Sequence, residues 1–214
     1  MMQLIVEQLV DYLKERLDKL SDHQQYWLGI AGAPGSGKST LCGELLSHLD
    51  DVAVVLPMDG YHYYRAQLDQ MPDPQEAHRR RGAPFTFNAQ RFVDDLAAAR
   101  QTGTGNFPSF DHGVGDPVED DIHLEKDRHK LVIVEGNYLL LDDPPWNRLK
   151  AIFDETWFLQ VDIETCKHRV RNRFLATGRD QQTAQFRVDY NDGPNAELVN
   201  SVSPKNANRI LTLP

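Results

Sequence analysis

One segment constrains the fold of this chain more than any other, because it matches the phosphate-binding pattern G-x-x-x-x-G-K-[ST] at every position: Gly-Ala-Pro-Gly-Ser-Gly-Lys-Ser at 32–39. Glycines let backbone N–H groups close around phosphate oxygens, where a side chain would block the approach. An apolar run at 26–31 and spaced leucines at 41–49 predict a strand before the segment and a helix after it. This context disfavours a glycine-rich turn that matches by chance and predicts a site for nucleotide phosphates.

The residues of this phosphate loop predict separate parts of nucleotide binding. The helix that begins near Lys38 directs its positive end towards the bound anion. Lys38 is expected to reach the β- and γ-phosphates of ATP, and Ser39 to supply an oxygen ligand to Mg²⁺. The predicted nucleotide-binding residues are Gly32, Ala33, Pro34, Gly35, Ser36, Gly37, Lys38, Ser39 and Thr40.

Short apolar runs alternate with helical patterns along the chain. Strands are predicted at 26–31, 52–56, 131–134, 156–161 and 208–213, and helices at 5–20, 41–49, 88–101 and 164–177. This alternation predicts an α/β fold of the P-loop NTPase type, with a parallel sheet of about five strands, helices on both faces and a mobile lid. At 214 residues the chain is expected to form a single domain.

Three regions of the domain at 1–214 are expected to have separate tasks: an N-terminal amphipathic helix at 1–21, an acceptor-site insert at 59–125, and a lid with its following helices at 164–200. The N-terminal helix is predicted to pack on the domain, since its acidic polar face disfavours a role at a membrane surface. The segments 110–112 and 191–196 consist of residues common in turns and are predicted to be loops.

Composition and charge limit the partners and the compartment. Lys plus Arg total 23 against 32 Asp plus Glu, a net charge of −9, which disfavours a general nucleic-acid binder. The sequence shows neither a signal peptide nor an apolar stretch long enough to span a membrane. Cys42 and Cys166 are predicted to be buried, reduced thiols of a cytoplasmic protein.

Two carboxylates follow predicted strands at the edge where the phosphate loop lies. Asp59 comes after the second strand, placed to take a proton from an acceptor hydroxyl or to orient it. A turn-forming Asp-Gly pair is the alternative for this position. Glu135 ends an apolar strand in the Walker B arrangement and is expected to hold Mg²⁺, directly or through water.

The chain resembles the family of uridine kinases, pantothenate kinases and phosphoribulokinases across nearly its whole length. The resemblance lies in GAPGSGKST at 32–40, MDGY at 58–61, VEGNYLLL at 134–141 and NANRIL at 206–211. It implies that Asp59 is the catalytic base and that Glu135 serves the metal. RRGAPFTFN at 80–88 and FPSFDHGVGDP at 107–117 are most similar to a bacterial branch labelled sugar-transport-associated (fructose) or pantothenate-kinase-like.

The resemblance also implies arginines in the lid that contact the phosphates during transfer, where a guanidinium binds two oxygens at once. Arg173 and Arg179 are the predicted catalytic arginines, beside Lys38 and Asp59. The family often shows Arg-Asp followed by Gly-Arg, whereas this chain has Arg173-Phe174 followed by Gly178-Arg179. A solvated helix face is the alternative explanation for some of the arginines in this helix.

The insert that joins the second and third predicted strands is expected to build the acceptor site. Arg79, Arg80 and Arg81 are interpreted either as an anion-binding group or as a surface run, with at least one of them on the surface. Phe110-Asp111-His112 corresponds to the acceptor segment of uridine kinases, and an ordinary turn is the alternative. The predicted acceptor-site residues are Tyr61, His62, Arg81, Asp111 and His112.

The sequence therefore predicts an ATP- and Mg²⁺-dependent kinase that phosphorylates a hydroxyl of a small metabolite, such as a sugar, a nucleoside or a pantothenate-like compound. A P-loop switch NTPase and a regulatory nucleotide-binding protein, each acting through a protein partner, are the alternatives. An Asn-Lys-x-Asp guanine motif is missing from the sequence, and Lys38, Asp59 and Glu135 are all present. The sequence leaves open whether the chain forms a homodimer.

Overall fold

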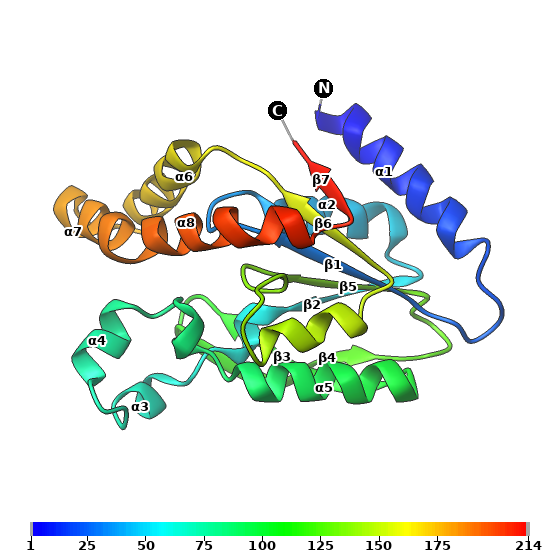
Figure 1. Cartoon of the computed structure of the whole chain (residues 1–214), viewed down its shortest axis with the longest axis horizontal. Helices are drawn as coiled ribbons and strands as arrows, with labels where there is room; N and C mark the ends of the chain where they lie inside the picture. The colour runs from blue at the N-terminus through cyan, green and yellow to red at the C-terminus, as the bar shows by residue number, and fades with distance from the viewer. Residues whose placement is uncertain (1, 213–214) are drawn as a thin grey trace.

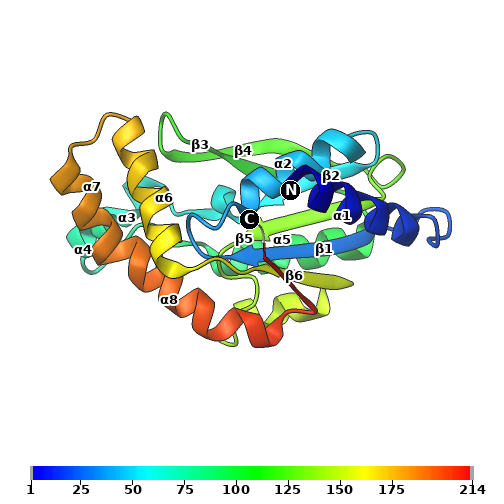
Figure 2. The same ribbon diagram turned by 90° about the horizontal axis from the view of Figure 1, so that it is seen from above.

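The core of the computed structural model, which describes residues 2–212, is a five-stranded parallel sheet in the order β2-β5-β1-β6-β7. Its strands are β1 (Tyr26–Gly32), β2 (Ala53–Pro57), β5 (Leu131–Gly136), β6 (Glu155–Leu159) and β7 (Arg209–Leu211). The predicted number of strands and their parallel arrangement are confirmed. Figures 1 and 2 show helices above and below this sheet.

Side chains that alternate along the central strands enter two separate hydrophobic clusters. On β5, Leu131 and Ile133 pack with the cluster under α1 (Met2–Leu17) and α2 (Lys38–Leu49). Val132 and Val134 belong to the cluster that includes residues of α5 (Ala89–Thr102) and α8 (Gly193–Val202). Because successive strand residues point to opposite faces, a strand of only apolar residues is buried on both faces.

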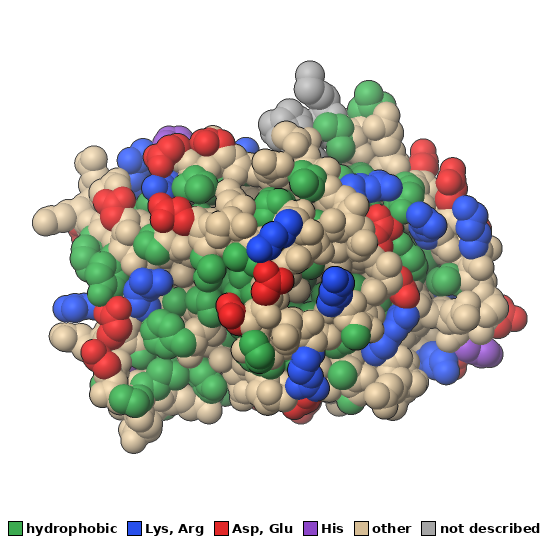
Figure 3. All heavy atoms as spheres, viewed as in Figure 1, with side chains coloured by type: hydrophobic (Ala, Val, Ile, Leu, Met, Phe, Trp, Pro, Cys, Tyr) green, Lys and Arg blue, Asp and Glu red, His purple; other side chains and the backbone are tan. Residues whose placement is uncertain are grey.

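The N-terminal helix α1 packs on the domain, as predicted. Its residues Leu9 and Leu13 are buried in the same cluster as Leu45 of α2, and the Tyr12 ring lies 6.3 Å from that of Trp157 in β6. Within residues 2–212, no helix combines the length and the apolar character needed to cross a membrane. On the face shown in Figure 3, basic and acidic side chains are interspersed.

The region predicted to form the lid contains α6 (Ile163–Ala176), α7 (Gln181–Arg187) and a π-helical turn at Val188–Asp192 that leads into α8. Asp162 caps α6 by accepting from the Thr165 N–H at 2.9 Å, and Asp180 caps α7 in the same way. The prediction of a loop at 191–196 is wrong. Pro194 lies in the first turn of α8, where its missing N–H costs no helical hydrogen bond.

The insert contains a strand pair that the sequence did not predict. β3 (Gly105–Asp111) and β4 (Asp116–Leu124) pair in an antiparallel hairpin. The prediction of a loop at 110–112 is wrong for Phe110 and Asp111, which end β3, whereas His112 lies in the hairpin turn. Pro108 and a register shift between Phe107 and Ser109 interrupt the polar-apolar alternation that signals a strand. The remaining elements are the helices α3 (Arg65–Leu68) and α4 (Pro74–Arg79) and 3₁₀ turns at Met58–Tyr61, Pro84–Thr86, Trp146–Ala151 and Ser203–Asn206.

Candidate active site

The strand register brings the predicted catalytic groups to one edge of the sheet. Glu135 pairs with Ile30 of β1 on one side and with Pro57 of β2 on the other. The phosphate loop follows β1 directly, and Asp59 lies two residues beyond the end of β2. Ligands of parallel α/β sheets bind at this carboxyl-terminal edge.

The conformation of the phosphate loop requires glycine at position 35. Gly35 has a φ of +81°, in the left-handed region that L side chains rarely adopt. A Cβ at this position would lie 2.5 Å from the backbone oxygen of Cys166 in α6. The loop therefore passes directly beneath the first helix of the lid.

The ammonium of Lys38 is buried and held in the loop by two oxygens. Its Nζ donates to Oδ1 of Asn137 at 2.8 Å and to the backbone oxygen of Ala33 at 3.2 Å. Burial lowers the pKa of Lys38, and the negative charges of Glu135 and Asp59 oppose this effect. The sequence analysis missed Asn137, although its position at the end of β5, two residues after Glu135, was the signal that could have identified it.

Ser39 and Glu135 form a pair of oxygen ligands beside the phosphate loop. The Ser39 hydroxyl donates to Oε1 of Glu135 at 3.1 Å. Burial raises the pKa of Glu135, while Lys38 and the Ser39 hydrogen bond act in the opposite direction. Mg²⁺ often uses one or two protein oxygens together with phosphate oxygens, and this pair fits that requirement. The described residues contain no larger cluster of Asp, Glu, His or Cys side chains.

Asp59 lies in the 3₁₀ turn after β2 with a side chain that is 42% exposed, so solvent and ligands can reach its carboxylate. The backbone of this turn is fixed on two sides. The His62 Nδ1–H donates to the Asp59 carbonyl at 2.8 Å, and Gly60 lies so close to the backbone of Pro108 in β3 that a Cβ would overlap it. Burial lowers the pKa of His62, and Asp59 opposes this effect. The hairpin therefore supports the turn that carries the predicted base.

The lid arginines occupy different positions. Arg169 of α6 donates to the backbone oxygen of Ser36 at 3.4 Å, which places it beside the phosphate loop. Arg173 and Arg179 are exposed, and the Arg179 guanidinium lies 4.8 Å from the Phe174 ring centroid. Among residues 2–212, neither donates a hydrogen bond to the phosphate loop, and their catalytic role stays a prediction.

Arg187 of α7 was missed by the sequence analysis, which placed the lid arginines before residue 180. It donates to the backbone oxygens of Arg79, at 2.7 Å, and of Arg81. Asn191 and Asn195 donate to the backbone oxygens of Arg81 and Gly82, at 3.0 and 3.2 Å. The end of the lid is therefore joined to the insert after α4, and the two regions lie near each other in Figures 1 and 2.

Of the predicted acceptor residues, the structure places His62 beside Asp59 and brings His62 and Arg81 to the ring of Phe110. The His62 ring lies 4.9 Å from that of Phe110, and the Arg81 guanidinium lies 5.6 Å from the same ring. Arg81 also pairs with Asp116 at 2.8 Å.

The other three predicted acceptor residues make different contacts within the insert. The buried Tyr61 donates to Asp95 of α5 at 2.9 Å. Asp111 is exposed and accepts from the N–H groups of Gly113 and Val114 within the hairpin turn. His112 is exposed at the same turn, with its ring 5.2 Å from that of Phe110. A binding role for these three residues stays a prediction.

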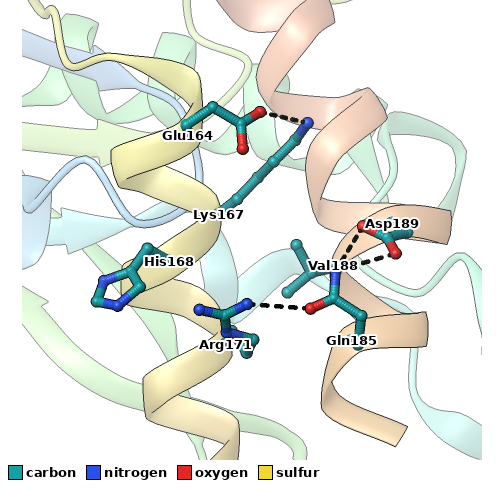
Figure 4. A pocket seen from close by; sticks show the side chains of 7 residues that line it. All are labelled: Glu164, Lys167, His168, Arg171, Gln185, Val188 and Asp189. Carbon is teal, nitrogen blue, oxygen red and sulfur yellow. Dashed lines mark hydrogen bonds and ion pairs between the residues drawn. The ribbon is translucent and has the colours of Figure 1, made fainter. Parts of the chain in front are cut away.

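A polar depression lies between α6 and α7, apart from the phosphate loop (Figure 4). Its side chains already bind one another: Lys167 pairs with Glu164 at 3.0 Å, and Gln185 accepts from Arg171 at 3.2 Å and donates to Asp189 at 2.9 Å. None of its lining residues is a predicted site residue.

Comparison with known proteins supports the kinase assignment. The chain is 39% identical over 206 residues to "Putative uridine kinase" of Schizosaccharomyces pombe, which covers 91% of the chain and 87% of that protein. It is 42% identical over 149 residues to "ATP-dependent kinase-like protein notR'" of Aspergillus versicolor, which covers 65% of the chain and 85% of that protein. No protein-family model matches the chain.

Solved structures agree with these relatives. The crystal structure of a "putative fructose transport system kinase" from Silicibacter sp. TM1040 is 31% identical, with a TM-score of 0.84 over 98% of both chains. The YFH7 structure from Saccharomyces cerevisiae, at 21% identity and a TM-score of 0.77, shares the fold. The resemblance seen in the sequence is confirmed: the chain belongs to the uridine kinase-like family of P-loop kinases.

Proposed function

We propose that this protein transfers the γ-phosphoryl group of ATP to a hydroxyl of a small metabolite, with Asp59 as the base. The observation that carries the proposal is the position of the Asp59 carboxylate. It is partly exposed, and it is close enough to Lys38 and Glu135 for its charge to affect the pKa values of both. A base at this position is next to the phosphate loop and to the insert that supplies the rest of the acceptor site.

In this reaction the acceptor hydroxyl gives its proton to the Asp59 carboxylate. Its oxygen forms a bond to the γ-phosphorus, the bond from that phosphorus to the β–γ bridging oxygen breaks, and ADP leaves. Lys38 binds the β- and γ-phosphate oxygens, and its contact with Asn137 holds the ammonium in position for them. Ser39 and Glu135 would hold Mg²⁺, which neutralises phosphate charge when it is bound.

An ADP-release screen over sugars, nucleosides and vitamin precursors tests this proposal. We expect ADP formation that depends on one acceptor class, and a loss of several orders of magnitude in Lys38→Ala and in Asp59→Asn. Asp59→Asn should still bind ATP, because the loop and Lys38 are unchanged. Near-normal turnover of Asp59→Asn with the true acceptor would contradict the assignment of the base. Rapid hydrolysis that no acceptor accelerates would instead indicate a switch NTPase.

A further inference from the structure

Arg80, in the insert, carries a charge that nothing in the described structure balances. Its Nε is shielded from solvent and has no hydrogen-bond partner among residues 2–212. Its Nη2 donates one long hydrogen bond to Oδ1 of Asn195 at 3.4 Å, and its guanidinium lies 6.0 Å from the Tyr190 ring centroid. In the same part of the chain, no carboxylate lies within ion-pairing distance of it. A partly buried guanidinium with an unsatisfied donor and no ion-pair partner is costly, and an anionic ligand would supply the missing acceptor.

The neighbouring arginines differ from Arg80 because each has a carboxylate partner, although the Nε of Arg81 is also buried without a hydrogen-bond partner. Arg81 pairs with Asp116 at 2.8 Å and donates to the backbone oxygen of Tyr63 at 2.9 Å. Arg187 lies 3.9 Å from Asp192 and donates to backbone oxygens of the insert. Burial lowers the pKa of Arg187, and the positive charges of Arg179, Arg81 and Arg80 lower it further. This group of arginines therefore carries more positive charge than its carboxylates balance. Arg80 is the arginine of the insert in this group that has no carboxylate partner.

The hydroxyl of Tyr138 connects this charge to the reaction site. Tyr138 follows Asn137 at the end of β5, and its hydroxyl donates to the backbone oxygen of Gly82 at 2.5 Å. Burial raises the pKa of Tyr138. Asp192 and Asp59 raise it further, whereas Arg80 opposes them. Asn195, which accepts from Arg80 at 3.4 Å, donates to the same Gly82 oxygen at 3.2 Å, so Arg80 and the Tyr138 hydroxyl meet at Gly82. The Tyr138 ring lies 5.7 Å from the Phe87 ring, which lies 3.9 Å from the ring of His62, and His62 is hydrogen-bonded to the Asp59 backbone.

We infer that the acceptor carries an anionic group, a carboxylate or a phosphate, that binds to Arg80 while the acceptor hydroxyl faces Asp59. This inference rests on the proposed function and specifies its substrate class. The ATP phosphates already have Lys38, the loop amides and Arg169 on the other side of the site, so they do not require a cation in the insert. A bidentate guanidinium contact suits either anion.

Matched acceptors that differ in charge test the inference by ADP release. Glycerol is compared with glycerate and with glycerol 3-phosphate, and ribose with ribose 5-phosphate. We expect the anionic members to have a kcat/KM at least about tenfold higher than the neutral ones. The comparison of kcat/KM for glycerate with that for glycerol 3-phosphate shows whether the site prefers a carboxylate or a phosphate. Equal or better use of the neutral compounds would overturn the inference and leave the kinase function intact.

Variants of Arg80 distinguish a role of this side chain in acceptor binding from a role in folding. Arg80→Met should raise KM for the anionic acceptor roughly 10- to 100-fold, with an unchanged KM for ATP, and Arg80→Lys should restore part of this loss. Arg79→Met is the matched control, because it removes the same charge from the preceding, exposed side chain. Equal effects of the Arg79 and Arg80 substitutions would contradict the inference.

A binding measurement remains decisive if no acceptor in the panel is phosphorylated. Inorganic phosphate is titrated calorimetrically into the protein saturated with Mg²⁺ and a non-hydrolysable ATP analogue, which occupies the phosphate loop. We expect the wild type and Arg79→Met to bind phosphate, and Arg80→Met to bind it at least about tenfold more weakly. Identical binding by Arg80→Met, or no binding by the wild type, would overturn the inference. Failure of the proposed function would instead appear as hydrolysis without any phosphorylated acceptor.

Discussion

The Lys38 ammonium lies 2.8 Å from Oδ1 of Asn137, so the lysine of the phosphate loop is held by an amide that follows the Walker B strand. This contact stabilises the ammonium in a buried position where desolvation lowers its pKa. Asn137 is therefore expected to position Lys38 for the phosphates.

Asn137→Ala should lower kcat roughly 10- to 100-fold, because a hydrogen bond to a charged group contributes about 1.5–3 kcal/mol. The dissociation constant for ATP should change less, since the loop amides are intact. Steady-state kinetics and an ATP titration measure both quantities. Asn147→Ala, which alters an exposed asparagine, is the control, and an unchanged kcat in Asn137→Ala would show that this contact has no role in the reaction.

Gly35→Ala should weaken ATP binding roughly tenfold or more. The left-handed φ of +81° costs about 1–2 kcal/mol for any residue with a Cβ, and the new methyl group would press on the Cys166 carbonyl. Gly43→Ala is the matched control, because its Cβ meets nothing within 4 Å and it lies within α2. That control should keep ATP affinity and gain up to about 1 kcal/mol of stability. Equal ATP affinities in the two variants would contradict the geometry of the loop.

The fold was predictable because its signals are local. The strands β1 and β5 are short apolar runs buried on both faces, and the phosphate loop fits only between a strand and a helix. The hairpin of β3 and β4 was missed because Pro108 and a register shift disturb its period of two. The helical start of α8 was missed because Asn-Asp-Gly-Pro is typical of a turn, and here Pro194 begins a helix instead.

The site was predictable where a motif defines each position, as for Lys38, Ser39, Asp59 and Glu135. Asn137 and Arg187 were missed because their roles depend on contacts over long sequence separations. Arg187 meets the insert across more than 100 residues, and no local pattern encodes that approach. The same holds for Arg80, whose missing partner is apparent only once its surroundings are known.

Leu13→Ala should destabilise the protein by about 2–5 kcal/mol, because Leu13 is fully buried between α1 and the sheet. Leu4→Ala removes the same atoms from a side chain of α1 that is 60% exposed, and it should change stability by about 0.5 kcal/mol or less. Urea denaturation followed by circular dichroism measures both. Similar small effects in the two variants would mean that α1 does not pack on the domain in solution.

His129 should make the protein less stable as the pH falls below its usual pKa of 6.5. Burial lowers the pKa of His129, and Arg128 lowers it further, so the unfolded chain binds the proton more readily than the folded one. The loss of stability begins near pH 6.5 and is complete below the lowered folded pKa. Its neutral Nδ1 accepts from the Glu125 N–H at 3.0 Å.

The variant His129→Asn keeps an acceptor and should show a shallower pH dependence between pH 7.5 and 5.5 in urea denaturation. His62, whose pKa is also lowered by burial, contributes equally to both proteins and cancels in the comparison. His48→Asn, at an exposed position, should retain the wild-type slope. A wild-type slope in His129→Asn would refute the assignment.

The fate of the γ-phosphoryl group tests the central claim most directly. ATP labelled at the γ-phosphorus is incubated with Mg²⁺, the acceptor identified by ADP release, and either the wild type or Asp59→Asn. The account predicts that the wild type transfers the label to an organic phosphate ester, and that Asp59→Asn binds the labelled ATP but transfers it more slowly by orders of magnitude. Label recovered only as inorganic phosphate, whether or not the acceptor is present, would contradict it.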